Sequence, residues 1–214
     1  MIHLNNLLKS YVCYMISAFG ISLTIKANIG VSSFSAMNMA LSSVASIKIG
    51  TITTFINMAF LLFYMYLTKF ELKQKYVIQT ISILMFGAFI NFFTYVVLND
   101  MSVSGYGYRL MLVALGTIIG GIAVGMIVNY DTITFPLEGV CVLIAQRTKY
   151  TFTLLRYAVD VFSVIISLSL SFIYDLPLFV REGTIISLLL FSYVIGIVQK
   201  RFIKRTLHPT AVES

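Results

Sequence analysis

The stretch GISLTIKANIGVSSFSAMNMAL at residues 20–41 decides the fold, because a similar stretch, GIAVGMIVNYDTITFPLEGVCV, occupies residues 121–142. Each completes a long apolar segment, passes through a polar break and continues as a shorter apolar segment. A gapless alignment makes three pairs: Gly20 with Gly121, Asn28 with Asn129 and Phe34 with Phe135. We interpret the two stretches as copies of one structural unit. The alternative is chance similarity within an ordinary six-helix bundle.

The composition requires lipid around most of the chain. Of its 214 residues, 59% are hydrophobic and 11% are charged, whereas a soluble domain is about half apolar and about a quarter charged. Six apolar segments have about the 20 residues needed to cross a bilayer, and each must be helical to satisfy its backbone in lipid. They lie at about 8–27, 51–68, 76–98, 108–129, 152–174 and 183–199. The sequence therefore predicts an all-α polytopic membrane protein with six transmembrane helices.

Two further segments, 31–47 and 132–147, follow the first and fourth of these spans. Each is too short and too polar to cross the bilayer, yet too apolar for a solvated loop. Non-helical backbone at membrane depth is tolerated only where protein buries it or water reaches it. We therefore predict a short re-entrant or interfacial helix in each segment.

The order long, short, long, long thus occurs twice. Beyond the first alignment, the later spans pair Asn57 with Asp160, after a two-residue insertion, and Gly87 with Ser192. An odd number of spans in each half makes the second half enter the bilayer from the opposite side, as in many secondary transporters. We predict a single membrane domain over 1–214, with inverted repeats at about 8–98 and 108–200 and a cytoplasmic tail at 201–214.

Basic residues give the orientation, because cytoplasmic loops are enriched in Lys and Arg. With the N-terminus inside, ten fall on the cytoplasmic side: Lys9, Lys69, Lys73, Lys75, Arg147, Lys149, Lys200, Arg201, Lys204 and Arg205. Four fall on the other side: Lys26, Lys48, Arg109 and Arg181. Both termini are therefore expected in the cytoplasm. This distribution explains the net charge of +7 without nucleic acid as a partner.

Three features resemble the YczE/YyaS/YitT group of bacterial integral membrane proteins: ANIGVSSFSAMNMALS at 27–42, VREGTIISLLL at 180–190, and the Asn57 and Asp160 spacing. The resemblance extends over about 10–201. That group usually has proline where this chain has Ser33, whereas Asp131 and Pro136 fit its second half. The resemblance implies the topology and a bacterial plasma membrane, and it implies no catalytic residues.

Two charged residues, Arg156 and Asp160, lie inside the span at 152–174. A charge at the centre of a bilayer costs at least about 2.5 kcal/mol on insertion scales. Arg156 is close enough to the start of the span to extend to the interface as an anchor. Asp160 is about 12 Å deep at a rise of ~1.5 Å per residue, and it shares a helix face with Arg156. It either lines a polar site or serves a purely structural pair with Arg156.

The second short segment adds two acids. Glu138 follows Pro136 and would lie in the first turn of a helix, where the helix dipole favours an anion. The functional alternative is that Glu138 pairs with Arg156 or binds a cation or a proton. Asp131 either caps the same helix or lines a re-entrant turn.

Three amides complete the set of pathway candidates: Asn28, Asn129 and Asn57. Interhelical hydrogen bonds, worth about 0.6–2 kcal/mol each, explain any one of them. A cluster of them along one polar lumen would indicate a substrate or ion pathway instead.

No catalytic chemistry is indicated. Cys13 and Cys141 lie in apolar stretches without metal-ligand spacing, and they are interpreted as small buried hydrophobic residues. The sequence shows no histidine cluster for a metal, no nucleotide-binding motif and no nucleophile close to a base. We therefore predict neither an enzyme nor a bound cofactor.

Two classes of function fit these features. One is a secondary transporter or permease for a small polar or charged solute, with a proton or cation as the coupling species. The other is a substrate-binding or accessory membrane subunit that works with a separate energy-coupling partner. The lipid bilayer is a partner in both cases, and the oligomeric state is left open.

Overall fold

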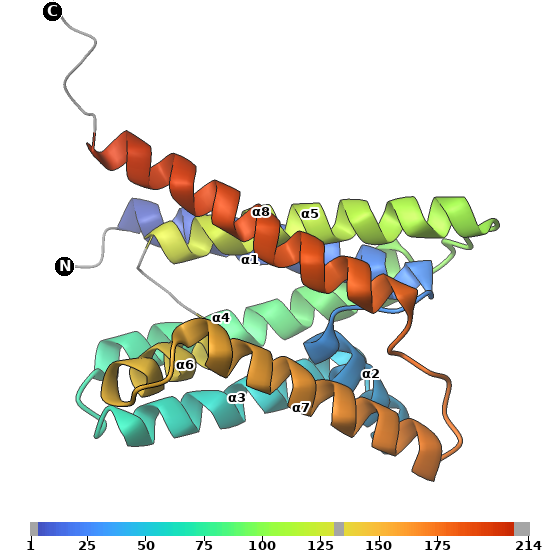
Figure 1. The fold of residues 1–214 in the computed structure, drawn as a ribbon, viewed down its shortest axis with the longest axis horizontal. Helices are drawn as coiled ribbons and strands as arrows, with labels where there is room; N and C mark the ends of the chain where they lie inside the picture. Colours follow the sequence, from blue (N-terminus) through green and yellow to red (C-terminus); the bar gives the residue numbers. More distant parts are fainter. Residues whose placement is uncertain (1–3, 131–134, 208–214) are drawn as a thin grey trace, which may run out of the picture.

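The structure is a computed structural model that describes residues 4–130 and 135–207, with side chains described within 6–127 and 135–198. Every regular element in these ranges is helical (Figure 1). The elements are α1 Leu4–Ala27, α2 Ser33–Ala45, α3 Ile49–Leu67, α4 Lys73–Phe92, the π-helical η1 Phe93–Val97, α5 Tyr106–Tyr130, α6 Pro136–Arg147, α7 Phe152–Ile173 and α8 Glu182–Leu207. The predicted order long, short, long, long is present twice, and both predicted short helices are formed.

Five of these segments are long and apolar enough to cross a membrane. They are Asn6–Ala27, Ile49–Leu67, Lys73–Val97, Tyr106–Ile127 and Phe152–Ile173. They correspond to the first five predicted spans. The apolar part of α8, Glu182–Val198, is shorter than these five. The chain thus has the helices of a membrane protein, and the sixth crossing stays a prediction.

The helices form two groups (Figure 1). In one, α5 packs against both α1 and α8. In the other, α3 packs against α4 and α6, and α2 packs against α3 and α7. Contact between α1 and α4 joins the groups, and α6 packs against α7.

Glycines bring α1 and α5 into backbone contact. A Cβ atom placed on Gly20 would lie 2.6 Å from the Gly116 oxygen and 2.8 Å from the Gly120 nitrogen. Further along α5, Gly121 and Gly125 accommodate Val194 and Val198 of α8. The glycine-rich face of α5 therefore serves close helix packing, as small residues commonly do in membranes.

Three aromatic rings fix the start of α6 against α1 and α4. The ring of Phe135 lies 4.5 Å from that of Tyr14 and 5.2 Å from that of Phe86, between ring centroids. All three side chains are buried. The aromatic contacts hold the first turn of α6, which carries Glu138, inside the protein.

Cys13 and Cys141 are buried free thiols, which confirms the prediction that they are small buried residues.

Candidate functional site

Arg156 and Asp160 pair across one turn of α7. The helix begins after Thr151, whose side chain accepts a hydrogen bond from the Leu154 amide. Arg156 Nη1 donates to Asp160 Oδ1 at 3.0 Å. The predicted pairing on one helix face is therefore present.

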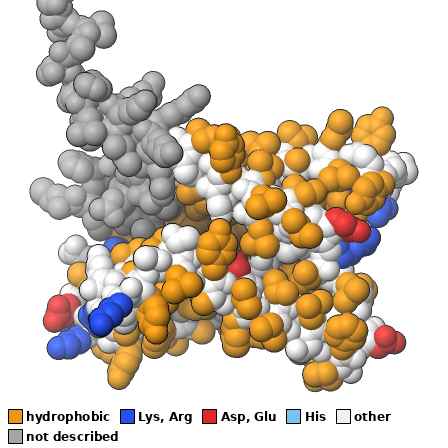
Figure 2. All heavy atoms as spheres, viewed as in Figure 1, with side chains coloured by type: hydrophobic (Ala, Val, Ile, Leu, Met, Phe, Trp, Pro, Cys, Tyr) orange, Lys and Arg blue, Asp and Glu red, His pale blue; other side chains and the backbone are white. Residues whose placement is uncertain are grey.

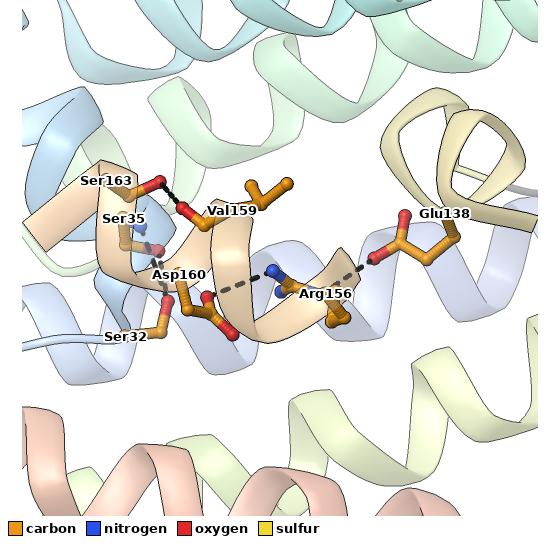
Figure 3. Close-up of polar contacts among 7 residues, drawn as sticks. All are labelled: Ser32, Ser35, Glu138, Arg156, Val159, Asp160 and Ser163. Atoms are coloured by element: carbon orange, nitrogen blue, oxygen red, sulfur yellow. Dashed lines mark hydrogen bonds and ion pairs between the residues drawn. The ribbon is translucent and has the colours of Figure 1, made fainter. Parts of the chain in front are cut away.

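Glu138 of α6 approaches the same guanidinium. Because α6 begins at Pro136, Glu138 lies in its first turn, as predicted. Its Oε1 atom is 3.8 Å from Arg156 Nε, an ion pair without a hydrogen bond. Figure 3 shows Arg156 between the carboxylates of Glu138 and Asp160. We call Glu138, Arg156 and Asp160 the charged cluster.

The two carboxylates of the charged cluster are held unequally. Asp160 receives the short hydrogen bond, whereas Glu138 Oε2 is buried and has no hydrogen-bond partner among the described residues. Burial raises the pKa of the Glu138 carboxyl, and the charge of Arg156 partly offsets that rise. Glu138 is therefore the carboxylate with a free oxygen, and its burial favours the protonated form.

The charged cluster lies away from the end of α7 and is not fully covered. Asp160 is eight residues beyond Phe152, where α7 begins, which is about 12 Å along the helix. The side chains of Arg156, Glu138 and Asp160 remain 24%, 22% and 15% exposed. Figure 2 shows an acidic side chain at the surface in the middle of one face, among hydrophobic side chains. Within a membrane span, hydrocarbon would leave such charges unsolvated, so this partial exposure favours contact with water or polar ligand atoms.

A stripe of serines extends the polar face of α7. Ser163, Ser167 and Ser171 follow Asp160 at helical spacing, and all three are buried. Ser167 Oγ donates to the Ala36 carbonyl oxygen of α2 at 3.1 Å. This stripe was not predicted, although the intervals of three and four residues after Asp160 indicate it.

The opposite face of α7 is strongly apolar. Phe162, Ile165 and Phe172 are exposed there, as expected for side chains that face lipid. The polar stripe and this apolar face together orient α7, with the charged cluster turned away from the lipid-facing side chains.

The first half carries a neutral polar group at the corresponding place. Asn38 Nδ2 of α2 donates to Thr53 Oγ1 of α3 at 3.0 Å, and Asn57 Nδ2 donates to the Thr53 carbonyl oxygen at 2.8 Å. All three side chains are buried. The repeat alignment pairs Thr53 with Arg156 and Asn57 with Asp160. We call Asn38, Thr53 and Asn57 the neutral cluster.

The structure brings together three of the seven predicted pathway residues, namely those of the charged cluster. Asn57 bonds within its own helix. Asn28 has a positive φ of 53° and is exposed, and its carbonyl oxygen accepts from Arg181 Nη1 at 3.3 Å. Asn129 lies in α5, but its side chain is outside the described set. Asp131 lies outside the described residues altogether.

The charged cluster can bind ions and polar groups by charge and hydrogen bonding. With both carboxylates ionised it carries one excess negative charge, so it can accept a proton or another cation. Among the described side chains, no three His, Cys, Asp or Glu residues lie close enough to hold a metal ion. The charges and hydrogen-bonding groups of the cluster suit recognition of polar groups and proton exchange.

Comparison with known proteins places the chain in a family without giving an activity. No curated protein and no solved structure matches it. One family model matches residues 5–200, which is nearly the whole chain. The chain therefore belongs to this family of unknown function, DUF6198.

Proposed function

We propose that the protein is a secondary transporter or permease for a small polar solute, which works by alternating access of two inverted repeats. The observation that carries this proposal is the charged cluster. It lies in the first half of α7, with Asp160 about 12 Å from the start of the helix, joins a short helix to a long one, and remains partly exposed. Ionisable groups in such positions commonly form substrate or proton pathways.

The helix contacts support the repeat. Suppose that helices α1, α2, α3 and α4 are exchanged with α5, α6, α7 and α8, respectively. The contact between α1 and α4 then corresponds to that between α5 and α8, and the contact between α2 and α7 corresponds to that between α6 and α3. The contact between α2 and α3 likewise corresponds to that between α6 and α7. The alignment pairs Gly20 with Gly121, and Gly20 meets Gly120 where α1 crosses α5. A two-fold axis that relates the halves would pass near this crossing.

The membrane setting belongs to the same proposal. With three spans in each half, including α8, the halves are oppositely oriented. The distribution of basic residues then favours both termini on the cytoplasmic side, and the family resemblance implies a bacterial plasma membrane. The resemblance to the YczE/YyaS/YitT group supports this topology.

The charged cluster suggests how a solute is held. The guanidinium of Arg156 suits an anionic or neutral polar group of the solute, and the carboxylates suit a cationic group. Glu138 Oε2 is the better place for the coupling proton, because Asp160 already receives the hydrogen bond from Arg156. A solute or proton that binds there changes the charge balance and thereby the relative energies of the two states.

The test is solute-driven current in proteoliposomes that contain only this protein. The solutes are the proteinogenic amino acids, small carboxylic acids and small ammonium compounds, each added as a concentration jump with and without a pH gradient. We expect a saturable current for at least one solute, and we expect Asp160→Asn to abolish it while the protein stays folded and inserted. Asp175→Asn is the matched control, because Asp175 is an exposed acid just beyond the end of α7.

Two results would contradict this proposal. Unchanged current in Asp160→Asn would remove the charged cluster from the mechanism. Solute binding without current, with transport only after an ATPase partner is added, would identify an accessory subunit instead.

A further inference from the structure

One helix contact breaks the correspondence between the halves. In the first half α3 packs closely against α4, whereas α7 and α8 share no extensive interface among the described residues. Figure 1 shows α7 and α8 in different helix groups, joined only by the connecting segment 174–181. The two halves therefore have different conformations of the same helix pair.

The α3–α4 interface is tight and specific. The Gly50 amide donates to Asn91 Oδ1 at 2.8 Å, and Asn91 Nδ2 donates to Thr51 Oγ1 at 3.1 Å. A Cβ atom on Gly87 would overlap Thr54 Oγ1 and the Gly50 oxygen. These contacts need a backbone approach that only small residues permit.

The corresponding surfaces of α7 and α8 are uncovered. The repeat alignment pairs Thr51 with Leu154, Thr54 with Tyr157, Gly87 with Ser192 and Asn91 with Gly196. Leu154 and Tyr157 are each 53% exposed, and Ser192 is exposed. A Cβ atom on Gly196 would meet nothing within 4 Å. Ser192 and Gly196 are thus small residues of α8 at the positions that align with the α3-contacting residues of α4, and no described helix packs against them.

We propose that α7 and α8 form the moving interface of the transporter, and that this structure is one of its two states. In the second state Leu154 and Tyr157 of α7 pack on α8 at Ser192 and Gly196, while α3 and α4 separate. This inference rests on the proposed function, because a two-fold relation between the halves makes the exchanged arrangement close in energy. The occupant of the uncovered surface is thus α8 of the same chain.

The exchange changes the surroundings of both polar clusters. Leu154 and Tyr157 lie on the side of α7 next to the face that carries Arg156 and Asp160, so docking of α7 on α8 brings α8 beside the charged cluster. Thr53 and Asn57 lie on the side of α3 next to the face that carries Gly50 and Thr54, so separation of α3 from α4 removes α4 from beside the neutral cluster. The two states therefore open the two clusters in turn, and because the halves are inverted they open toward opposite sides of the membrane.

The test measures distances between spin labels in lipid nanodiscs, in acidic and in alkaline buffer. One variant carries labels at the exposed Ala158 of α7 and at Ile197 of α8, outside the docking residues. A second carries labels at Phe55 and Phe92, on α3 and α4. Both have Cys13 and Cys141 replaced by alanine. We expect two distance populations for each helix pair. The fraction of molecules with a short α7–α8 distance and the fraction with a long α3–α4 distance should rise together.

A blocking variant adds an independent readout. Gly196→Leu fits the present structure, because the space around Gly196 is open, but it prevents close docking of α7 on α8. We expect it to remove the short α7–α8 population and the solute-driven current, with thermal stability unchanged. Gly107→Leu is the matched control on α5, where a Cβ atom also meets nothing within 4 Å, and it should retain both.

Three outcomes would overturn the inference. They are a single α7–α8 distance in both buffers, an α3–α4 distance that stays constant while α7 and α8 close, and a short distance that disappears on dilution with unlabelled protein. The last would show that a second copy of the chain covers α7. If Asp160→Asn still abolishes current in any of these cases, the transporter proposal stands and only the moving interface is wrong.

Discussion

Arg156→Ala is expected to lower the free energy of unfolding by about 3 kcal/mol, the lower end of the cost of breaking a buried ion pair, because the pair is partly buried and its loss leaves uncompensated charge behind. Arg156 is the shared cation of Glu138 and Asp160, from which it lies 3.8 and 3.0 Å. Its removal leaves two carboxylates without a positive partner in the cluster. Denaturant titration of the detergent-solubilised protein measures the loss.

The double variant Arg156→Ala with Asp160→Asn separates charge from packing. It removes the same arginine and also the negative charge of Asp160, so only the charge of Glu138 remains unpaired. The double variant should therefore be more stable than Arg156→Ala alone. Equal stability of the two variants would show that charge does not dominate the loss. Wild-type stability of Arg156→Ala would mean that Arg156 is an anchor solvated at the interface, which is the alternative that the sequence left open.

Gly20→Val is expected to cost about 3 kcal/mol or more, at the upper end of the usual range for overpacking. The new Cβ atom would lie 2.6 Å from the Gly116 oxygen and 2.8 Å from the Gly120 nitrogen. Both are backbone atoms of α5, so no side chain can move aside and α1 must separate from α5. Thermal melting in detergent and the yield of monodisperse protein measure the effect.

Gly107→Val tests the same change where there is room. Gly107 also lies in α5, but a Cβ atom there meets nothing within 4 Å. Valine has a higher helix propensity than glycine by a few tenths of a kcal/mol, so this variant should be at least as stable as wild type. If the two variants were equally stable, the crossing of α1 and α5 at Gly20 would be wrong.

Most helices could be predicted because their signals are local. Apolar length gives the long helices, and intermediate length and polarity give α2 and α6. Pro136 begins α6 and so places Glu138 in the first turn, as the sequence predicts. The pairing of Arg156 with Asp160 follows from helix geometry alone.

The rest depends on tertiary packing. The approach of Glu138 to Arg156 requires α6 to pack against α7, which no local pattern states. Asn28 shares an aligned position with Asn129, yet its left-handed backbone turns the chain outward, where Arg181 binds its carbonyl oxygen. The difference between the α3–α4 and α7–α8 pairs is also invisible in the sequence, because one repeat pattern is compatible with both conformations.

The most direct test of the whole account is the access of water to the charged cluster. A membrane-impermeant, positively charged thiol reagent is applied to Asp160→Cys and Phe162→Cys, both with Cys13 and Cys141 replaced by alanine. The two positions are at the same depth, but Phe162 is 62% exposed on the apolar face of α7. If the charged cluster lines an aqueous pathway, the cysteine at 160 reacts and the cysteine at 162 does not. An inert cysteine at 160, or equal reaction at both positions, would contradict the account.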